Sequence, residues 1–557
     1  GAPAARHAAG EHHDTVIIGA GPTGLSAAYH AGPGALLIEQ DGSVGGLCRS
    51  LEVNGFTFDY AGHIMFSNDP YVHELYARLL GDNVHWQDRE AWIYSKNVFT
   101  RYPFQGALYG LPADVIKECI VGAIEARFGS LAKRPGGNGA GDKAGGAGHA
   151  APGGAPAPAR CHIGKVGDCC GDGVLESTAR LVEPSRKKGN GDREGPQNFE
   201  EFIYQVWGAG IAKHFAIPYN RKLWAVPLTE METSWLGGRV PLPDLEEMIE
   251  GALRPVPRPM GPNARFGYPL RGGFQSLMDG FLPHIRGRLR LNAPVLAVSP
   301  LRRTVEVAGY GEIGFDHLIS TMPLPLLIRS MGDEAPPHVR QAAAGLRYVS
   351  VRCVHIGVGR PNLTEKHWIY YPEDTVFHRI FVQGNASPHC NPPGGFGLTC
   401  EITYSHSKPL PCDGDALLQR CIDDCRRVGI IGADDPIWAG AQCDLPFAYV
   451  VYDHQRARNV KIVRDWLAGQ NIILAGRYSE WEYYNSDHTF IAGRKAVETV
   501  RARQPAAAQP AAAQAAAQQA MAQQAVAQPA VRKTTPIALL AAPLHAPTRA
   551  QPARGAR

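Results

Sequence analysis

The chain has 557 residues, 44% of them hydrophobic, so it is long enough to bury the cores of two or three domains. Its 56 basic and 52 acidic residues give a net charge of +4, which is too small to favour nucleic acid or an anionic membrane surface as a partner. No apolar run approaches the roughly 20 residues that span a bilayer, and the N-terminus lacks the apolar core of a signal peptide, so we expect a cytoplasmic protein with no membrane insertion. The twelve cysteines are irregularly spaced, and a chain of this size does not need disulfide bonds for stability, so we expect free thiols.

The first pattern, residues 14–40, is typical of a strand, a tight glycine turn, a helix and a second strand. Gly19, Gly21 and Gly24 form the G-x-G-x-x-G spacing in the turn, and Glu39 ends the second strand. In that context the glycines let the backbone approach a pyrophosphate at a helix N-terminus, while the carboxylate accepts a ribose hydroxyl. The stretch therefore predicts a dinucleotide site.

Two further stretches favour FAD over NAD as the dinucleotide. The sequence DGSVGGLCRS adds Gly45 and Gly46 soon after the acidic residue, where a flavin and its diphosphate could lie against bare backbone. Near the other end of the chain, NIILAGRYSEW predicts a strand followed by Gly476 and Arg477. An N-terminal fingerprint combined with a C-terminal strand, glycine and helix resembles flavoproteins of the amine oxidase superfamily, in which the two ends of the chain meet over one FAD.

Two helical patterns, over residues 108–128 and 198–216, flank a segment rich in Gly, Ala and Pro. We expect this insertion, residues 129–195, to be disordered, because it has too little apolar content to offset the entropy of ordering. The same reasoning applies to the tail, residues 504–557. The insertion contains four candidate metal ligands whose spacing fits no closed zinc pattern, so we expect no metal site: Cys161, His162, Cys169 and Cys170.

Residues 345–405 alternate between apolar and polar positions, which predicts strands. The chain is thus expected to be an α/β protein, in which a Rossmann-type FAD-binding domain is interleaved with a helical domain and an antiparallel β-sheet domain. We expect the FAD-binding domain to use residues 12–100, 241–340 and 466–503, the mainly helical substrate domain 101–240, and the β-sheet substrate domain 341–465.

Six separated motifs resemble UDP-galactopyranose mutase, in order and at similar intervals. They are GFTFDYAGHIMFS (55–67), RYPFQ (101–105), PYNRKLWAVPLTEMETSWLGGRV (218–240), GPNARFGYPLRGGF (261–274), HWIYYPED (367–374) and GRYSEWEYYNSDHTF (476–490). The likeness covers residues 14–500 except the insertion, which makes it far more specific than the glycine fingerprint. The first five motifs resemble the eukaryotic branch most, and the closing motif the bacterial branch.

The resemblance implies a redox-neutral isomerase that interconverts UDP-galactopyranose and UDP-galactofuranose, a reaction of cell wall polysaccharide biosynthesis. In that family the reduced form of FAD attacks the anomeric carbon of the nucleotide-sugar through N5 and displaces UDP, and NADPH is the reductant in eukaryotic members. A diphosphate leaving group needs cations that hold it while it is detached, and the sugar must face N5 at near-attack distance. The resemblance also allows a homo-oligomer.

Two arginines match the family's diphosphate clamp, Arg239 and Arg379. A planar guanidinium binds phosphate oxygens in a bidentate manner, worth about 1.5 to 3 kcal/mol per contact, and the alternative for each arginine is a surface ion pair. Three tyrosines match family positions that donate hydroxyls to the same phosphates, although by sequence alone each fits a core or interface aromatic better: Tyr370, Tyr449 and Tyr483.

The resemblance also implies a uracil and ribose pocket, because a pyrimidine is held by an aromatic face and an amide. Its expected members are Phe104, Gln105, Phe215, Tyr219 and Asn220. Trp224 and Asn263 match positions beside the galactose, and a hydrophobic anchor is the alternative for Trp224.

His63 matches a family histidine that faces the flavin near N5, where its tautomer and charge could tune the reduced ring; a buried core histidine is the alternative. The candidate catalytic residues are therefore His63, Arg239 and Arg379. Arg477 is expected beside the cofactor, with Asn485, Asp487 and His488 near the isoalloxazine and the N-terminus of the last helix, and Asp487 could instead cap that helix. Bacterial members carry an acidic residue where this chain has Asn485, and the loss of that carboxylate could change which NDP-sugar fits.

Two other functions remain open. A true oxidoreductase of the amine oxidase superfamily, such as a protoporphyrinogen oxidase, would share the FAD domain but line its cavity with apolar groups. A flavin-binding scaffold that uses the insertion and the tail to recruit partners would have no catalytic site. The two arginines and three tyrosines favour an anionic ligand, and thereby the mutase.

Overall fold

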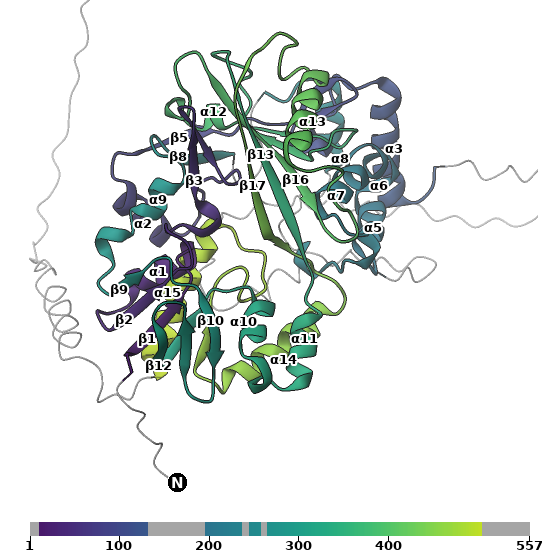
Figure 1. Ribbon diagram of the computed structural model, residues 1–557. Helices are drawn as coiled ribbons and strands as arrows, with labels where there is room; N and C mark the ends of the chain where they lie inside the picture. The colour runs from purple at the N-terminus through teal and green to yellow at the C-terminus, as the bar shows by residue number, and fades with distance from the viewer. Residues whose placement is uncertain (1–9, 132–194, 237–243, 258–263, 504–557) are drawn as a thin grey trace, which may run out of the picture. The chain divides into compact units, whose positions relative to one another are not determined.

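The computed structural model describes residues 10–131, 195–236, 244–257 and 264–503 (Figure 1). Arg239 and Asn263 lie outside the described residues, and so do almost all of the expected insertion and the whole of the expected tail. The described residues up to Val500 belong to one compact unit.

The first sheet has a parallel core of five strands in the order β9-β2-β1-β12-β18. These strands come from distant parts of the chain: β1 (His12–Ile18), β2 (Ala35–Ile38), β9 (Arg288–Arg290), β12 (Gly311–Ser320) and β18 (Ile472–Leu474). The first half of β12 also forms antiparallel pairs with β11 (Thr304–Val307), which pairs with β10 (Val295–Ser299). The topology is the Rossmann type that the sequence predicts.

The central strands of this sheet are apolar along their whole length because both faces are covered. Ile17 and Leu37 point into one hydrophobic core, whereas Val16, Ile18 and Leu36 belong to another. Successive residues of a strand face opposite sides, so a parallel sheet covered on both faces needs an uninterrupted apolar run rather than an alternating one.

The helices α1 (Pro22–His30) and α15 (Ser486–Arg503) come from opposite ends of the described chain and lie against each other (Figure 1). The Ser26 hydroxyl donates a hydrogen bond of 2.6 Å to the carbonyl of Phe490. A Cβ at Gly493 would lie 2.4 Å from the Thr23 carbonyl oxygen, so only glycine permits this approach. The N-terminal fingerprint and the C-terminal helix are therefore parts of one structure.

The second sheet has seven strands in the order β17-β13-β16-β15-β14-β6-β7 and is antiparallel except between β14 and β6. Its strands are β6 (Ala91–Ser95), β7 (Val98–Arg101), β13 (Tyr348–Val358), β14 (Trp368–Tyr370), β15 (Arg379–Phe381), β16 (Phe396–Tyr404) and β17 (Ile437–Val450). Helix α13 (Gly414–Arg427) packs on one face, over Val354 and Leu398. The strands β6 and β7 join this sheet although they lie at the end of the segment 12–100, which the sequence suggested for FAD binding.

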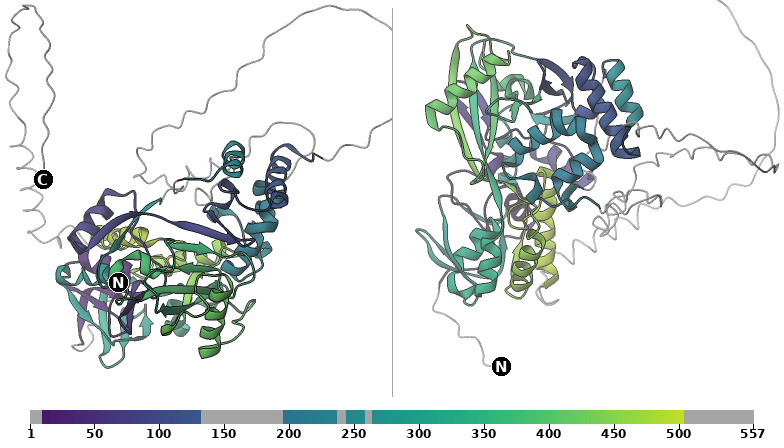
Figure 2. Two further views of the ribbon diagram at one scale, coloured as in Figure 1. Left: turned by 90° about the horizontal axis from the view of Figure 1, so that it is seen from above. Right: turned by 90° about the vertical axis from the view of Figure 1, so that its right-hand side faces the viewer.

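The helical part stands beside the second sheet (Figures 1 and 2). It consists of α3 (Ala113–Phe128), α8 (Leu245–Leu253) and a continuous helical run made of α5 (Phe199–Phe202), η4 (Ile203–Trp207), α6 (Gly208–Ile211), η5 (Ala212–Ala216) and α7 (Ile217–Trp224). The segments η4 and η5 are π-helical. A Cβ at Gly210 would lie 2.1 Å from the Glu118 carbonyl oxygen, so α6 can cross α3 at backbone contact only with glycine there.

Shorter elements connect these layers. The β3 (Ser50–Val53) and β4 (Phe56–Asp59) strands form a hairpin, and β5 (Val84–Asp88) pairs with β8 (Arg265–Pro269). The remaining α-helices are α2 (Pro70–Leu80), α9 (Gln275–Asp279), α10 (Leu324–Ser330), α11 (Pro337–Ala344), α12 (Gln383–Ala386) and α14 (Arg456–Ala468).

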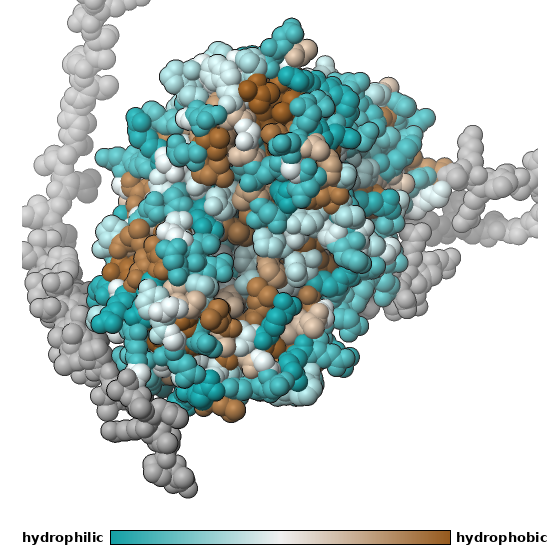
Figure 3. Space-filling view, in the orientation of Figure 1, coloured by the Kyte–Doolittle hydropathy of each residue, from teal (hydrophilic) through white to brown (hydrophobic). Residues whose placement is uncertain are grey.

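Hydrophobic residues on the face drawn in Figure 3 form separate patches among hydrophilic ones. No helix in the described part of the chain combines the length and the apolar character that crossing a bilayer requires. The nine cysteines that the structure describes are free thiols, and seven of them are buried.

Candidate functional site

A cavity of about 590 Å³ is lined by segments of both sheets and of the closing stretch 475–489. The first sheet contributes the ends of β1 and β2 with the turns that follow them, and the second sheet contributes residues of β13, β15, β16 and β17. A site between these layers can hold one end of a ligand on a Rossmann turn and the other on the antiparallel sheet.

The glycine turns form a wall of bare backbone in this cavity. Gly19, Gly21 and Gly46 line it. Gly46 has a φ of +55°, and a Cβ there would lie 3.0 Å from the Gly21 Cα, so the two turns touch through backbone alone. Gly24 does not line the cavity but packs inside the turn, where a Cβ would lie 1.7 Å from the Gly19 carbonyl oxygen. Such a surface fits a flat or phosphorylated group at close range.

Glu39 is buried and lines the same cavity. Its carboxylate accepts hydrogen bonds from the backbone N–H groups of Ala20, at 2.7 Å, and Asp41, at 2.9 Å. Each carboxylate oxygen has a further lone pair, so these bonds orient the group without exhausting it. In dinucleotide sites of this type, a carboxylate at the end of the second strand accepts a hydrogen bond from a ribose hydroxyl.

Arg477 follows β18 and lies among tyrosines. Its guanidinium carbon is 5.1 Å from the ring centre of Tyr449 and 4.6 Å from that of Tyr483. Its two terminal nitrogens donate to the carbonyls of Tyr484 (2.9 Å) and Ala448 (3.0 Å). The buried Nε has no hydrogen-bond partner among the described residues, although the side chain lines the cavity. An unpaired buried donor of this kind is costly, which fits a ligand acceptor at this place.

His63 lines the cavity and stacks on the ring of Phe274, at 5.3 Å between centres. Its Nδ1–H donates to the Ala61 carbonyl at 2.8 Å, which leaves Nε2 as the unprotonated nitrogen. Burial lowers the pKa of His63 to about 4, with the positive charges of Arg477 and Arg379 acting in the same direction. The imidazole is therefore neutral at physiological pH.

The register of the second sheet places three polar side chains in one row. Tyr370 of β14 lies opposite Arg379 of β15, and Arg379 lies opposite Glu401 of β16. Arg379 and Glu401 line the cavity and form an ion pair, with Nε and Oε2 3.0 Å apart. Glu401 is 1% exposed and Arg379 19%, so the pair is largely withdrawn from water.

The surroundings of Arg379 keep its charge. Burial alone would lower the pKa of Arg379, but Glu401 and the phenols of Tyr449, Tyr219 and Tyr370 raise it well above its usual value. The guanidinium is thus a fixed cation that lies among three tyrosines. It is not a surface ion pair, which was the alternative that the sequence left open.

Tyr449 and Tyr483 lie side by side on the cavity wall, with ring centres 6.1 Å apart and planes 10° from parallel. Trp224 contacts both, at 5.9 Å and 6.4 Å between centres. Its indole N–H is buried with no hydrogen-bond partner among the described residues. These three aromatic side chains come from α7, β17 and the closing stretch.

The expected uracil pocket is a closed aromatic column. Phe104 stacks on Phe215 at 4.9 Å, and Phe215 stacks on Tyr219 at 5.3 Å, with planes 12° and 9° apart. All three rings are buried, and rings in direct contact leave no slot for a base between them. Asn220 is buried as well and donates to the Ala216 carbonyl at 2.8 Å. None of these four residues lines the cavity.

The structure thus brings part of the expected set together. The expected site residues that line the cavity are Gly19, Gly21, Glu39, Gly46, His63, Arg379, Tyr449, Gly476, Arg477, Tyr483 and Asn485. Those that are described but do not line it are Gly24, Gly45, Phe104, Gln105, Phe215, Tyr219, Asn220, Trp224, Tyr370 and Asp487. Asp487 lies in the first turn of α15 and pairs with His488 at 3.0 Å.

Three charged residues were missed by the sequence analysis. Glu401 interrupts the apolar strand FGLTCEITYS, and a carboxylate at a buried strand position is a signal that could have found it. Arg49 lines the cavity and pairs with Asp41 at 2.7 Å. Arg89 donates to the Tyr370 hydroxyl at 3.0 Å, a contact between distant segments that no local pattern reveals.

Two family models match the chain. That of the NAD(P)-binding Rossmann-like domain matches residues 17–79, and that of flavin containing amine oxidoreductases matches residues 225–501. The fold class expected from the sequence is therefore confirmed.

Solved structures agree. The chain is similar to a crystal structure of reduced UDP-galactopyranose mutase, at 26% sequence identity and a TM-score of 0.72, over 88% of this chain and 96% of that one. In fold alone it is similar to a protein from Exiguobacterium sp. 255-15 provisionally named protoporphyrinogen oxidase, at 16% identity and a TM-score of 0.60 over 89% and 100% of the two chains. Putrescine oxidase bound to putrescine is similar at 15% identity and a TM-score of 0.57, over 88% and 99%.

The residues of the cavity fit FAD as the dinucleotide. The bare backbone of Gly21 and Gly46, the carboxylate of Glu39 and the unpaired Nε of Arg477 are the groups that would hold it. The chain has the amine oxidase superfamily fold of a flavin-dependent enzyme.

Proposed function

We propose, on the premise that this chain has the fold of a flavin-dependent enzyme of the amine oxidase superfamily, that it is a mutase. It interconverts UDP-galactopyranose and UDP-galactofuranose, or a closely related pair of NDP-sugars. Bound FAD in its reduced form supplies an electron-rich nitrogen, N5, to the anomeric carbon, and the sugar is neither oxidised nor reduced overall.

One observation carries the proposal: a largely buried guanidinium and several phenols line the same cavity as the glycine turns of the dinucleotide site. Arg379 lies among tyrosines on the second sheet and lines the same cavity as the glycine turns. A nucleotide-sugar that must release and recapture UDP needs a fixed cation where the diphosphate rests. The similarity to reduced UDP-galactopyranose mutase, at 26% identity, supports the same ligand class.

Arg379 binds the diphosphate in this proposal, and Tyr449 and Tyr483 donate their hydroxyls to it. Tyr370 belongs to the same group through its register opposite Arg379, and Arg89 holds its hydroxyl at 3.0 Å. Arg239 is the second cation that the family resemblance suggests. A guanidinium with phenols around it binds phosphate oxygens while remaining shielded from water, which strengthens each contact.

The closed column of Phe104, Phe215 and Tyr219 is the base-binding element in this proposal. A uracil ring enters only if one of these contacts opens, because the rings stack at 4.9 Å and 5.3 Å. The column lies on η2 (Phe104–Gly106), the π-helical segment η5 and α7. Such π-helical turns are frequent at functional sites. Nucleotide binding is therefore an induced fit.

His63 acts as a neutral imidazole. Its Nδ1–H is held by the Ala61 carbonyl, so Nε2 is an acceptor for the cofactor or the sugar. A neutral ring beside an electron-rich flavin adds no positive charge of its own, and Arg477 supplies that charge instead.

An oxidoreductase of the amine oxidase type is the second candidate, because its fold is shared at 15% and 16% identity and part of the wall is apolar. Val351, Leu445 and Phe447 belong to that apolar wall. The largely buried ion pair of Arg379 and Glu401 argues against a purely apolar substrate. Such a substrate would remove both charges from water without offering them a polar partner, and this desolvation costs free energy.

The deciding experiment uses the FAD-loaded protein, reduced and kept free of oxygen, with UDP-galactofuranose. We expect UDP-galactopyranose to form over many turnovers while the reductant consumed stays below one equivalent per sugar. An oxidase would instead turn over with oxygen and need no prior reduction. Absence of isomerisation with every NDP-galactose and NDP-arabinose tried, on protein that holds reduced FAD, would sink the proposal.

A further inference from the structure

Two glycines of the RGGF motif, Gly272 and Gly273, have no role in the site described above. Both have positive φ, +79° and +64°. A Cβ at Gly273 would lie 2.9 Å from Oδ1 of Asp59 and 2.3 Å from the Ser50 hydroxyl. Only glycine at position 273 lets this loop close over the buried carboxylate of Asp59.

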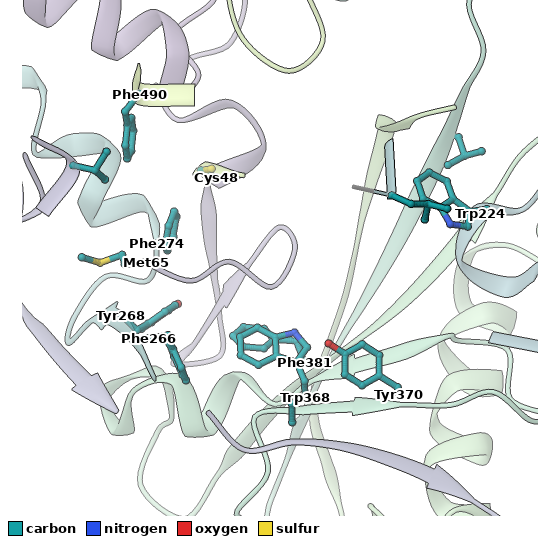
Figure 4. Packing of buried hydrophobic residues seen from close by; sticks show 14 of the residues in the cluster. Cys48, Met65, Trp224, Phe266, Tyr268, Phe274, Trp368, Tyr370, Phe381 and Phe490 are labelled. Atoms are coloured by element: carbon teal, nitrogen blue, oxygen red, sulfur yellow. The ribbon is translucent and has the colours of Figure 1, made fainter. Parts of the chain in front are cut away.

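Asp59, the last residue of β4, is completely buried and holds three donors. Its Oδ1 accepts from the Ser50 hydroxyl at 2.7 Å and from the Phe274 N–H at 2.9 Å, and its Oδ2 accepts from the Tyr268 hydroxyl at 2.7 Å. The carboxylate thus joins β3, β4, β8 and the loop before α9 at one point. Figure 4 shows Tyr268 and Phe274 with Met65 in the same region of the core.

Further hydrogen bonds extend this network to helix α12. Gln383 of α12 donates through Nε2 to the Tyr268 hydroxyl at 2.7 Å, and its Oε1 accepts from the Asp59 N–H at 3.1 Å. Gln383, Asp59 and Tyr268 are each 0% exposed, whereas Ser50 at the edge of the network is partly exposed. Buried networks in which each group has its partner fix one geometry.

The segment that carries His63, residues 60–66, is anchored at one end to the loop before α9 and at the other to β8. At its start, Asp59 binds the backbone of Phe274, and near its end Met65 exchanges two backbone hydrogen bonds of 2.9 Å with Gly267 of β8. Between these anchors, the His63 ring rests on the Phe274 ring at 5.3 Å. The position of the imidazole therefore depends on Phe274, and that of Phe274 on Asp59.

We propose that Asp59 is a positioning residue, which acts through Phe274 to fix His63 at the cofactor face of the cavity. Asp59 does not line the cavity, so its effect on the site is transmitted through these contacts. The inference rests on the proposed function only for its effect on turnover.

The cost of this arrangement supports a role beyond packing. Burial raises the pKa of Asp59 to about 6, against the opposing effect of its three donors and Gln383. A carboxylate that ionises reluctantly lowers stability at neutral pH relative to an isosteric neutral group, because folding must take its charge out of water.

The test compares FAD-loaded wild type, Asp59→Asn, His63→Gln and the double variant by the midpoint potential of the bound flavin. We expect Asp59→Asn to shift the potential in the same direction as His63→Gln, and the double variant to match His63→Gln alone. In the isomerase assay, the kcat of Asp59→Asn should fall about 10- to 100-fold, while its KM should stay nearly unchanged. Asp244→Asn, at the N-cap of α8, makes the same chemical change away from the cavity and should leave the potential at the wild-type value.

Equal potentials for wild type and Asp59→Asn, or additive shifts in the double variant, would overturn the inference. If Asp59→Asn does not hold FAD, Ser50→Ala and Tyr268→Phe each remove one donor and should give smaller shifts of the same sign; unchanged potentials in both would overturn it as well. A wild type that fails to isomerise any NDP-sugar defeats the proposed function, whereas the potentials still decide the role of Asp59.

Discussion

Arg379 and Glu401 lie directly opposite each other on neighbouring antiparallel strands, and their ion pair forms part of the cavity wall. Because Glu401 accepts from Nε at 3.0 Å and also from Nη2, the carboxylate occupies one edge of the guanidinium. No described residue pairs with Nη1, so this group can meet a ligand. A cation held in this way keeps its place whether or not an anion is bound.

Replacing Arg379 by Ala should weaken UDP binding about 10- to 100-fold, since a charge-assisted contact is worth roughly 1.5 to 3 kcal/mol. The protein should still hold FAD, because the groups proposed to hold it, the glycine turns and Glu39, follow strands of the first sheet, whereas Arg379 belongs to the second. Calorimetric titration of UDP into the FAD-loaded variant measures the effect. Arg352→Ala is the control: this arginine also pairs with a carboxylate on the second sheet, that of Asp444, but it does not line the cavity. Unchanged UDP affinity in the Arg379 variant would contradict the phosphate role.

Replacing Glu401 by Gln should lower the free energy of unfolding by about 3 kcal/mol without ligand, because it leaves a largely buried guanidinium unpaired. Added UDP should restore part of the loss, since the diphosphate supplies the missing negative charge. The rise in Tm on adding saturating UDP should therefore be larger for Glu401→Gln than for wild type. An equal or smaller rise would show that UDP does not reach Arg379.

Replacing Gly46 by Ala should abolish FAD binding, because the new Cβ would press on the Gly21 backbone at 3.0 Å. Gly332→Ala is a matched control: Gly332 has the same φ of +55°, but a Cβ there meets nothing within 4 Å. Both variants pay about 1 to 2 kcal/mol of left-handed backbone strain, so only the crowding differs. The ratio of flavin absorbance to protein absorbance after purification separates them. Equal flavin content in the two variants would contradict the role of Gly46 and Gly21 in holding FAD.

His63 should make stability fall as the pH is lowered. Its pKa is about 4 in the folded protein and 6.5 is the usual value, so the unfolded chain binds more protons between these limits. The contribution is complete above pH 6.5 and is lost as the pH falls towards 4. Between pH 7 and pH 4.5, the free energy of unfolding of wild type should drop by about 2 kcal/mol more than that of His63→Gln. Parallel pH profiles from denaturant titrations would show that His63 is not buried as described.

Much of the fold could be predicted from local patterns. The apolar runs of β1 and β2, with the glycine turn between α1 and β1, are specified by residues close together in sequence, so the Rossmann core and its dinucleotide turn were expected. Alternation over 345–405 likewise predicted the strands β13 and β16. The strands β6 and β7 were not assigned to the second sheet, because a short strand's partner depends on the rest of the sheet.

The site was predicted only in part for the same reason. Arg379 was expected to be a clamp residue, but its pairing with Glu401, 22 positions away, follows only from the register of β15 and β16. The aromatic residues of the expected base pocket were identified, yet their stacking in a closed column is a matter of packing between η2 and the helical run.

The sequence by itself determined which backbone turns can approach a dinucleotide, because glycine spacing and strand hydrophobicity act over a few residues. Only the tertiary structure decided which charges meet. Ser50 and Asp59 are partners in one hairpin, but Tyr268 lies 209 positions from Asp59, and the free energy of burying the carboxylate depends on Tyr268 being brought to it by another strand. Long-range register, and not local propensity, therefore set the electrostatics of the site.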